Sequence, residues 1–354
     1  MVSAGWRNRS ANRRMPDATT KPVSSWRRLQ LPSDWPPTLI VVIDTEEEFD
    51  WGAPFDSRAR STENIFYQPL AQEVMDRHGV VPTYVVDHPV ADTPAAAAIL
   101  RKIAEDGRCE IGAHLHPWVT PPHEEAVNEF NSFPGNLGPA LEREKLARLT
   151  DRIELAFGKR PEVYKAGRYG IGPATFSTLQ ELGFWIDASV VPHTDFSDRQ
   201  GPDFTKFPAG PFRPVPRILE LPLSVHFVGA LASAGSAFYP LLGFQPGARL
   251  RLPGIAARLS LLERLRLSPE DHSLADMLRQ TRAALRRGER YFMLTYHSST
   301  LLPGATEYVR DESDRSRFLK RLDGFLQFFL TECKGQTRNI QAVAGALWPA
   351  PAVA

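Results

Sequence analysis

The sequence predicts an α/β protein in which a parallel sheet is flanked by helices and curled into a closed or nearly closed barrel. Two observations predict it: short apolar runs alternate with amphipathic segments from residue 38 onward, and the alternation repeats often enough to curl a sheet. With 354 residues, of which 42% are hydrophobic, the chain can bury a large core without disulfides.

The elements follow from the apolar runs in order. Strands are expected at 38–44, 82–86, 110–116, 163–167, 184–189, 217–223 and 291–297. Helices are expected at 64–77, in a segment ending near 106, and near 140–157, 173–182, 273–287 and 314–332. Pro173 and Gly183 bracket one of these helices, and Ser273 with Asp276 forms a capping box at another. These end signals support the predicted spacing.

Domain organisation is read from composition. Residues 1–36 are rich in Arg, Ser, Pro and Asn, which is typical of a disordered basic arm. Residues 37–354 are expected to form a single barrel domain with an insertion at about 223–270. The apolar run at 227–244 contains Gly229, Gly235 and Pro240, so it is a poor spanning helix. We expect a loop or lid there, with peripheral contact to a membrane surface as an alternative.

Charge and cysteine content limit the classes of binding partner and the cellular compartment that we expect. The net charge of +1 leaves no field that would steer the protein to nucleic acid, so a small or neutral substrate fits better. Cys109 and Cys333 cannot form a disulfide framework or a paired-cysteine metal site. No apolar stretch resembling a signal peptide follows the N-terminal arginines. We therefore expect a cytoplasmic protein.

The first candidate site motif is the acidic cluster that ends the run TLIVVIDTEEEFDW. Barrel active sites lie at the ends of parallel strands, where this cluster would emerge. Side chains alternate along a strand, so Asp44 and Glu46 would point to one side. One carboxylate could bind a metal ion while the other accepts a proton. Taken alone, such a cluster also fits a solvated loop.

The second motif is EIGAHLHPW, in which His114 and His116 are two residues apart at the end of an apolar segment. They would face the same direction, and with a carboxylate they make a donor set suited to Zn, Fe, Co or Ni. A structural role for the pair is the alternative.

Three further residues follow apolar strands. Arg168 in YKAGRYGIGP could hold the catalytic carboxylate, or could be a structural ion-pair residue. Asp187 in FWIDAS and His297 in MLTYHSS could form a carboxylate–histidine pair that protonates a leaving amine. Five such clusters, all at strand ends, together indicate one site.

Read in order, the segments IDTEEE, EIGAHLH, GRYGIG, IDAS and LTYH resemble the motifs of the polysaccharide deacetylase (NodB-homology) family, as a divergent branch, over about residues 38–300. The resemblance implies a deformed (β/α) barrel with seven strands and one divalent ion, zinc first and cobalt, nickel or iron as alternatives. It also implies a hydrolase that removes an acyl group, usually N-acetyl, from a sugar in polysaccharide or glycolipid metabolism. The implied roles are metal ligation by Glu46, His114 and His116, proton acceptance by Asp44, proton donation by His297, orientation of Asp44 by Arg168, and orientation of His297 by Asp187.

The sequence departs from the family pattern in three places. The acidic pair is spread as Asp-Thr-Glu, the histidine pair is HxH, and Gly170 replaces a proline of the arginine loop. These departures leave two candidates for the carboxylate ligand. We assign Glu46 because strand periodicity places it on the same side as Asp44, with Glu47 as the alternative.

Candidate substrate contacts are Trp51, Trp118 and Phe133, whose rings could stack on sugars, and Asn136 in FNSFPGN. Core packing is the alternative for each aromatic residue. Other functions also stay open: a glycoside hydrolase that uses two carboxylates without metal, an amidase acting on a small cyclic amide, or a carbohydrate-binding relative without turnover. Dependence on His114 and His116 would separate a metal-dependent hydrolase from the glycosidase.

Overall fold

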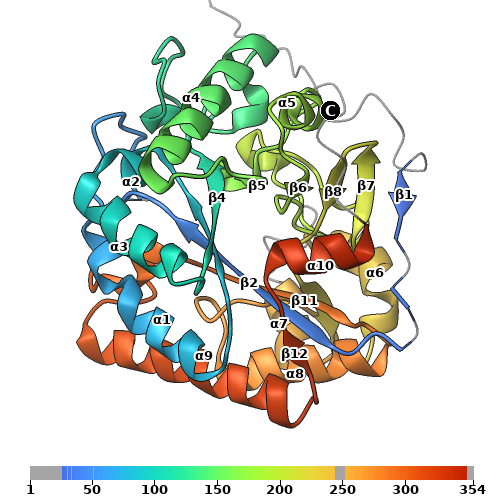
Figure 1. Ribbon diagram of the computed structural model, residues 1–354. Helices are drawn as coiled ribbons and strands as arrows, with labels where there is room; N and C mark the ends of the chain where they lie inside the picture. Colours follow the sequence, from blue (N-terminus) through green and yellow to red (C-terminus); the bar gives the residue numbers. More distant parts are fainter. Residues whose placement is uncertain (1–25, 30, 33, 51, 244–251, 349–354) are drawn as a thin grey trace, which may run out of the picture.

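The computed structural model describes residues 26–29, 31–32, 34–50, 52–243 and 252–348. Its main sheet has ten strands, and seven of them lie side by side, all parallel, in the order β8-β6-β5-β4-β3-β2-β11. The seven strands are β2 (Thr38–Thr45), β3 (Thr83–Val86), β4 (Glu110–Leu115), β5 (Val163–Ala166), β6 (Ile186–Asp187), β8 (Ile218–Glu220) and β11 (Tyr291–His297). The predicted deformed (β/α) barrel is confirmed (Figure 1).

Three short strands extend this sheet. β12 (Gln336–Thr337) pairs in parallel with the start of β2, and β7 (Phe212–Val215) pairs antiparallel with β8. β1 (Arg27–Arg28) pairs antiparallel with β7, and Trp26 is buried against Phe212. The boundary predicted for the disordered arm, residue 36, is therefore too late, because residues 26–29 join the fold. Residues 1–25 lie outside the described residues.

The barrel closes without direct pairing of β8 and β11, and this deforms it. The segment after β8 fills the gap, since Ser224 Oγ accepts the Met293 N–H at 2.8 Å. Leu267 continues the bridge: its N–H donates to the Ser224 carbonyl, and its own carbonyl accepts the Thr295 N–H. Residues at both ends of the predicted insertion thus form part of the barrel wall.

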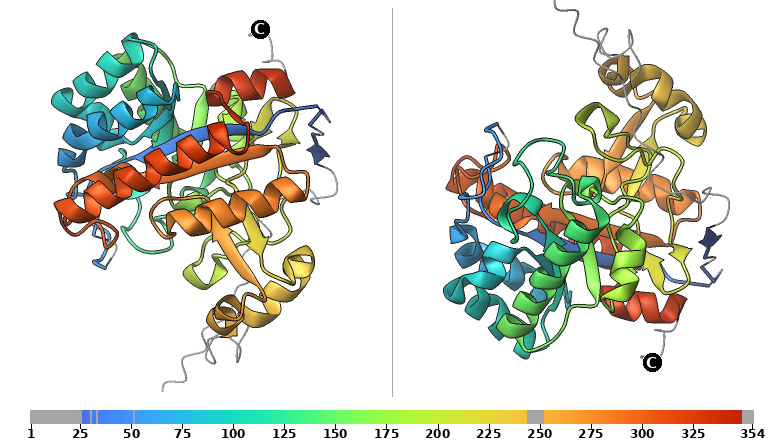
Figure 2. Two further views of the ribbon diagram at one scale, coloured as in Figure 1. Left: turned by 90° about the horizontal axis from the view of Figure 1, so that it is seen from below. Right: turned by 90° about the horizontal axis from the view of Figure 1, so that it is seen from above.

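Helices cover the outside of the curled sheet (Figures 1 and 2). The strands are consequently buried on both faces, which explains why β2 is a continuous apolar run with every residue buried. The helices are α1 (Gln68–Arg77), α2 (His88–Asp92), α3 (Pro94–Glu105), α4 (Pro139–Phe157), α5 (Thr175–Glu181), α8 (Leu274–Arg286), α9 (Glu312–Thr331) and α10 (Ile340–Leu347). The predicted capping box at Ser273 is present.

The segment predicted as a loop or lid has regular structure. β9 (Val225–Val228) and β10 (Glu263–Arg266) form an antiparallel hairpin, which carries α6 (Gly235–Gly243) and α7 (Leu252–Arg258). The expectation of a loop was wrong because glycines and a proline were taken as breaks in one long segment, whereas they separate several short elements. No helix in the described part of the chain is long and apolar enough to cross a membrane.

Candidate metal centre and its flanking groups

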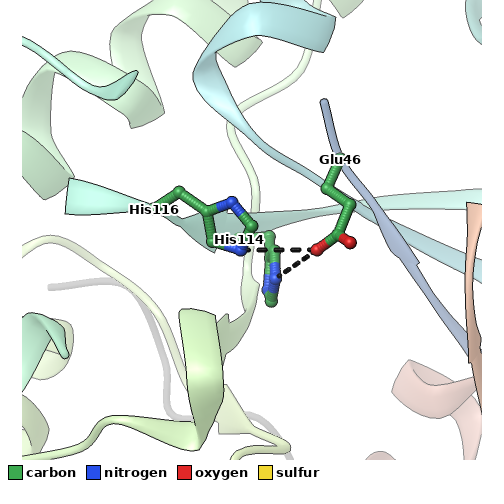
Figure 3. Close-up of side chains that lie close together, drawn as sticks. All are labelled: Glu46, His114 and His116. Carbon is green, nitrogen blue, oxygen red and sulfur yellow. Dashed lines mark ion pairs between the residues drawn. The ribbon is translucent and has the colours of Figure 1, made fainter. Parts of the chain in front are cut away.

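Glu46, His114 and His116 come together as a candidate metal centre at the carboxyl ends of β2 and β4 (Figure 3). Glu46 Oε2 lies 3.6 Å from His114 Nε2 and 3.3 Å from His116 Nε2. All three side chains are at most 3% exposed. One carboxylate oxygen and two imidazole nitrogens facing a common point form a donor set suited to a divalent ion such as zinc.

The other nitrogen of each imidazole determines which tautomer is present. His114 Nδ1 lies 2.9 Å from the Lys165 carbonyl, which can only accept, so this nitrogen carries the proton. His116 Nδ1 lies 2.9 Å from Glu47 Oε2 and donates to that carboxylate in the same way. Both Nε2 lone pairs are therefore free and directed at Glu46, as metal-ligating histidines require. The residues fit a bound cation.

Local backbone geometry allows His116 to lie close to the segment that follows β5. Gly167 follows β5 and packs against His116: a Cβ atom at this position would lie 2.5 Å from His116 Cδ2 and 2.3 Å from the Leu115 carbonyl oxygen. Only glycine fits this contact.

Glu47, the alternative ligand, lies behind His116. Its Oε1 accepts the Trp118 indole N–H at 2.9 Å, and its backbone N–H donates to Asp87 Oδ2 at 2.7 Å. Burial raises the pKa of Glu47 to about 7. Both Glu47 oxygens are thus engaged in holding His116 and Trp118, which favours Glu46 as the ligand that faces the two Nε2 atoms.

Asp44 lies beside the candidate metal centre and is held by a lysine. Lys165 Nζ donates to the two Asp44 oxygens at 2.6 and 2.8 Å and to Thr295 Oγ1 at 2.9 Å. Burial would raise the pKa of Asp44, but Lys165, His114 and His297 outweigh it and lower the pKa to about 2. Asp44 is therefore a carboxylate at neutral pH.

His297 lies on the other side of Asp44, with its Nε2 3.6 Å from Asp44 Oδ2. Its Nδ1 lies 3.1 and 3.2 Å from the two oxygens of Glu270, which also accepts the His297 N–H and the Thr300 hydroxyl. Burial opposes protonation, but Glu270, Glu46 and Asp44 raise the pKa of His297 to about 10. Its side chain is 24% exposed, more than the side chains of the metal centre, so solvent reaches the site from this side.

The predicted role of Arg168 is corrected, because its guanidinium does not reach Asp44. It pairs with Glu129 at 2.6 Å, donates to Ser132 and lies over the Phe133 ring. The backbone at Arg168 turns with a φ of 54°, which directs this residue away from the strand. The adjoining Lys165, inside the strand, holds Asp44 instead.

The predicted role of Asp187 is corrected for a reason of register. Asp187 is paired with Tyr164, whereas Lys165 is paired with His114. Neighbouring residues of a strand point to opposite faces, so Asp187 lies on the face of the sheet away from Lys165 and Asp44. Its Oδ1 accepts the Ser189 hydroxyl, and Glu270 takes the place beside His297.

Two of the three predicted sugar platforms, Trp118 and Phe133, are buried and not available to a ligand. Trp118 is buried and stacks on His116 with 4.2 Å between ring centroids, and Phe133 is buried beneath Arg168. Asn136 Nδ2 donates to the Phe130 and Gln200 carbonyls, which links two loops. Trp51 lies outside the described residues. Trp118 and Phe133 therefore take the alternative role considered for the aromatic residues, which is packing in the protein interior.

Two site residues were missed by the sequence reasoning. A signal existed for Lys165: it is a single lysine inside the apolar segment VYKAG, where an unpaired charge would be costly. Glu270 follows β10 in the predicted insertion and ends no apolar strand of the barrel, so strand-end reasoning could not find it.

The comparisons with known proteins place the fold. No model of a known protein family matches the sequence. No curated protein matches it either. A solved structure from Mycobacterium smegmatis, titled as a polysaccharide deacetylase, is similar at 17% identity with a TM-score of 0.51, over 90% of this chain and 93% of that one. An allantoinase structure is similar at 15% identity with a TM-score of 0.52, over 91% of this chain and 96% of that one.

The chain therefore has the NodB-like deacetylase fold that its motifs predicted. Because both a protein titled as a polysaccharide deacetylase and an allantoinase have this fold, the fold leaves the substrate open.

Proposed function

We propose that this protein is a divalent-metal-dependent hydrolase that removes an acyl group from an N-acylated sugar. The observation that carries the proposal is the buried convergence of Glu46, His114 and His116, with Asp44 and His297 flanking it. The two flanking groups have opposite charge states, as a base and an acid acting in one reaction need.

Glu46, His114 and His116 would hold the ion. When bound, a divalent ion polarises an acyl carbonyl and lowers the pKa of water. The remaining chemistry belongs to the side chains around it.

Asp44 accepts a proton from the attacking water as the water oxygen bonds to the acyl carbon. Lys165 keeps this carboxylate ionised and fixes its orientation through both oxygens. Because the Asp44–Lys165 pair is buried, the carboxylate has one orientation and needs no rearrangement before the proton moves.

His297 donates a proton to the amine nitrogen as the carbon–nitrogen bond breaks. Glu270 keeps the imidazole protonated and fixes the ring by its contact with Nδ1, which leaves the Nε2 proton to be transferred. The products are a carboxylic acid and a free amino sugar, so protons and bonds balance.

The proposal is tested by metal analysis of the purified protein and by acid release from N-acetylated amino-sugar oligomers, before and after chelation. We expect activity that is lost on chelation and restored by zinc or cobalt. The variant H116A should lose metal and activity together, whereas H123A, at an exposed histidine of the Pro122 turn, should keep both. Full activity after exhaustive chelation would favour a metal-free glycoside hydrolase and would contradict the proposal.

The substrate class is tested in the same assay by adding allantoin and an unacetylated glycan. Release of acid from acetylated sugars alone supports the proposal. Turnover of allantoin alone would assign the site to an amidase acting on a cyclic amide.

A further inference from the structure

The β9–β10 hairpin and the helices that it carries form a projection, here named the hairpin lobe and defined as residues 225–243 and 252–266. Figure 2 shows α6 and α7 standing away from the barrel at the end of the hairpin in both views. The lobe has a small core of its own, in which Phe227, Ala256 and Leu262 pack together. This core is separate from the main core of the barrel.

The hairpin lobe carries an unusual share of exposed apolar side chains. Eight large hydrophobic side chains are exposed among the described residues, and five of them belong to the lobe: Leu231, Phe238, Ile255, Leu259 and Leu261. Backbone contacts bring several of them together, since the Leu231 N–H donates to the Leu261 carbonyl and the Leu259 N–H to that of Ile255. Such a cluster of exposed apolar groups on one projection indicates a binding surface.

The formal charges between residues 220 and 263 are all positive. Between Glu220 and Glu263 the sequence contains no Asp or Glu, although 41 of the 354 residues of the chain are acidic. It contains three arginines in that interval, Arg249, Arg251 and Arg258. Arg258 is exposed at the end of α7 and has no ion-pair partner in the described part of the chain.

We propose that the hairpin lobe binds the surface of an anionic lipid bilayer. Its exposed leucines and Phe238 would enter the interface, and Arg258 would meet the lipid headgroups. The charge pattern favours lipid over a second copy of this chain. A symmetric contact between two lobes would place Arg258 of one copy on a lobe whose single carboxylate, Glu263, is already paired with Arg279.

The base of the lobe reaches the rim of the candidate active site. Arg264 donates to Thr194 Oγ1 and the His193 carbonyl, in the loop that follows β6. Arg266 donates to the Tyr169 hydroxyl at 2.7 Å, and the Tyr169 ring lies 5.4 Å from Lys165 Nζ. A lobe bound to lipid would therefore hold the site near the bilayer. This consequence rests on the proposed function, whereas lipid binding itself does not.

The test is co-flotation of the full-length protein with vesicles, which requires no turnover. We expect binding to phosphatidylcholine vesicles that contain phosphatidylglycerol, and much weaker binding to phosphatidylcholine alone. L259S should weaken binding about tenfold, the loss expected for a leucine that becomes buried. R258Q should weaken it about fivefold, the electrostatic gain of one arginine near an anionic surface.

The matched control is L155S, at a leucine on α4 that is 75% exposed, compared with 63% for Leu259. L155S should leave vesicle binding unchanged, and L259S should leave turnover of a soluble substrate unchanged. Three results would overturn the proposal: no binding to anionic vesicles, binding that survives L259S and R258Q through another region such as residues 1–36, or self-association through Leu259 without lipid binding.

Discussion

Two buried groups of ionisable side chains lie on opposite faces of the same sheet. On the inner face Asp44 is paired with Lys165, and the pKa of Asp44 falls to about 2. On the outer face Asp187 and Glu220 are neighbours in register, and burial raises the pKa of both carboxyl groups. Glu142 of α4 is also buried on that side, and burial raises its pKa to about 7.

The depth of burial is the same on both faces, so burial alone does not determine the charge state. A cation within hydrogen-bonding distance keeps the inner carboxylate ionised. The outer carboxyl groups have no cationic hydrogen-bond partner among the described residues, so they favour their neutral form. Among these buried carboxyl groups, the ionised one therefore lies on the inner face, beside the candidate metal centre.

The largest expected effect comes from removing the charge of the inner carboxylate. D44N should lower turnover by about a hundredfold to ten-thousandfold, because the proton acceptor is lost. Metal content should stay the same, since Asp44 is not one of the three ligands facing each other. Turnover and metal content are measured on the same sample. D50N, at an exposed acid of the same cluster, is the control and should retain activity. Full activity in D44N would contradict its role.

The next effect concerns the cation of the inner pair. K165M should destabilise the protein by about 3–5 kcal/mol, because Asp44 is left as an uncompensated buried charge. Urea unfolding measures this, with K159M at an exposed lysine as the control. The double variant D44N/K165M should recover much of the stability, because neither charge is then left unpaired. Additive losses in the double variant would show that the two side chains do not act as a pair.

Much of this arrangement could be predicted from the sequence. β2 is an apolar run ending in Asp44, and the HxH spacing directs His114 and His116 the same way, because strand periodicity alone determines both. These local rules need no knowledge of neighbouring strands. The convergence of Glu46 with both histidines follows from the parallel order of β2, β3 and β4.

The partner of His297 could not be predicted, because it depends on strand register and on a distant segment. β6 has only two residues, so a shift of one position decides whether Asp187 faces inward or outward. Glu270 reaches His297 only because the insertion returns to the barrel wall after β10. Neither relation leaves a periodic signal in the chain.

A smaller effect is expected on the outer face, in the pH dependence of stability. Glu142 titrates near 4.5 when unfolded and near 7 when folded, so the folded protein holds this proton more tightly. The free energy of unfolding should therefore fall by up to about 3 kcal/mol as the pH rises from about 4.5 to 7, and should level off above that. E142Q should lack this part of the slope, because glutamine stays neutral.

Urea unfolding of E142Q and wild type between pH 4 and pH 8 measures the difference. E142Q should be the more stable of the two at pH 8 and no more stable at pH 4. The control is E144Q on the same helix, whose side chain is 45% exposed, and it should follow the wild-type curve. A wild-type slope retained in E142Q would show that Glu142 is not the group responsible.

The smallest expected effect is that of D187N, and comparing it with E270Q separates the two candidate partners of His297. D187N should change turnover by less than about threefold, because the Asp187 side chain faces away from the site. E270Q should lower turnover by at least about a hundredfold, because it removes the carboxylate beside His297 Nδ1. Both substitutions replace one buried acid by its amide, so differences in turnover report position. E270Q should also shift the alkaline limb of the pH–rate profile to lower pH. The reason is that the pKa of His297 falls when its main anionic partner is removed. A profile that shifts in D187N and stays fixed in E270Q would place the supporting carboxylate on the outer face and reverse the comparison between the two faces.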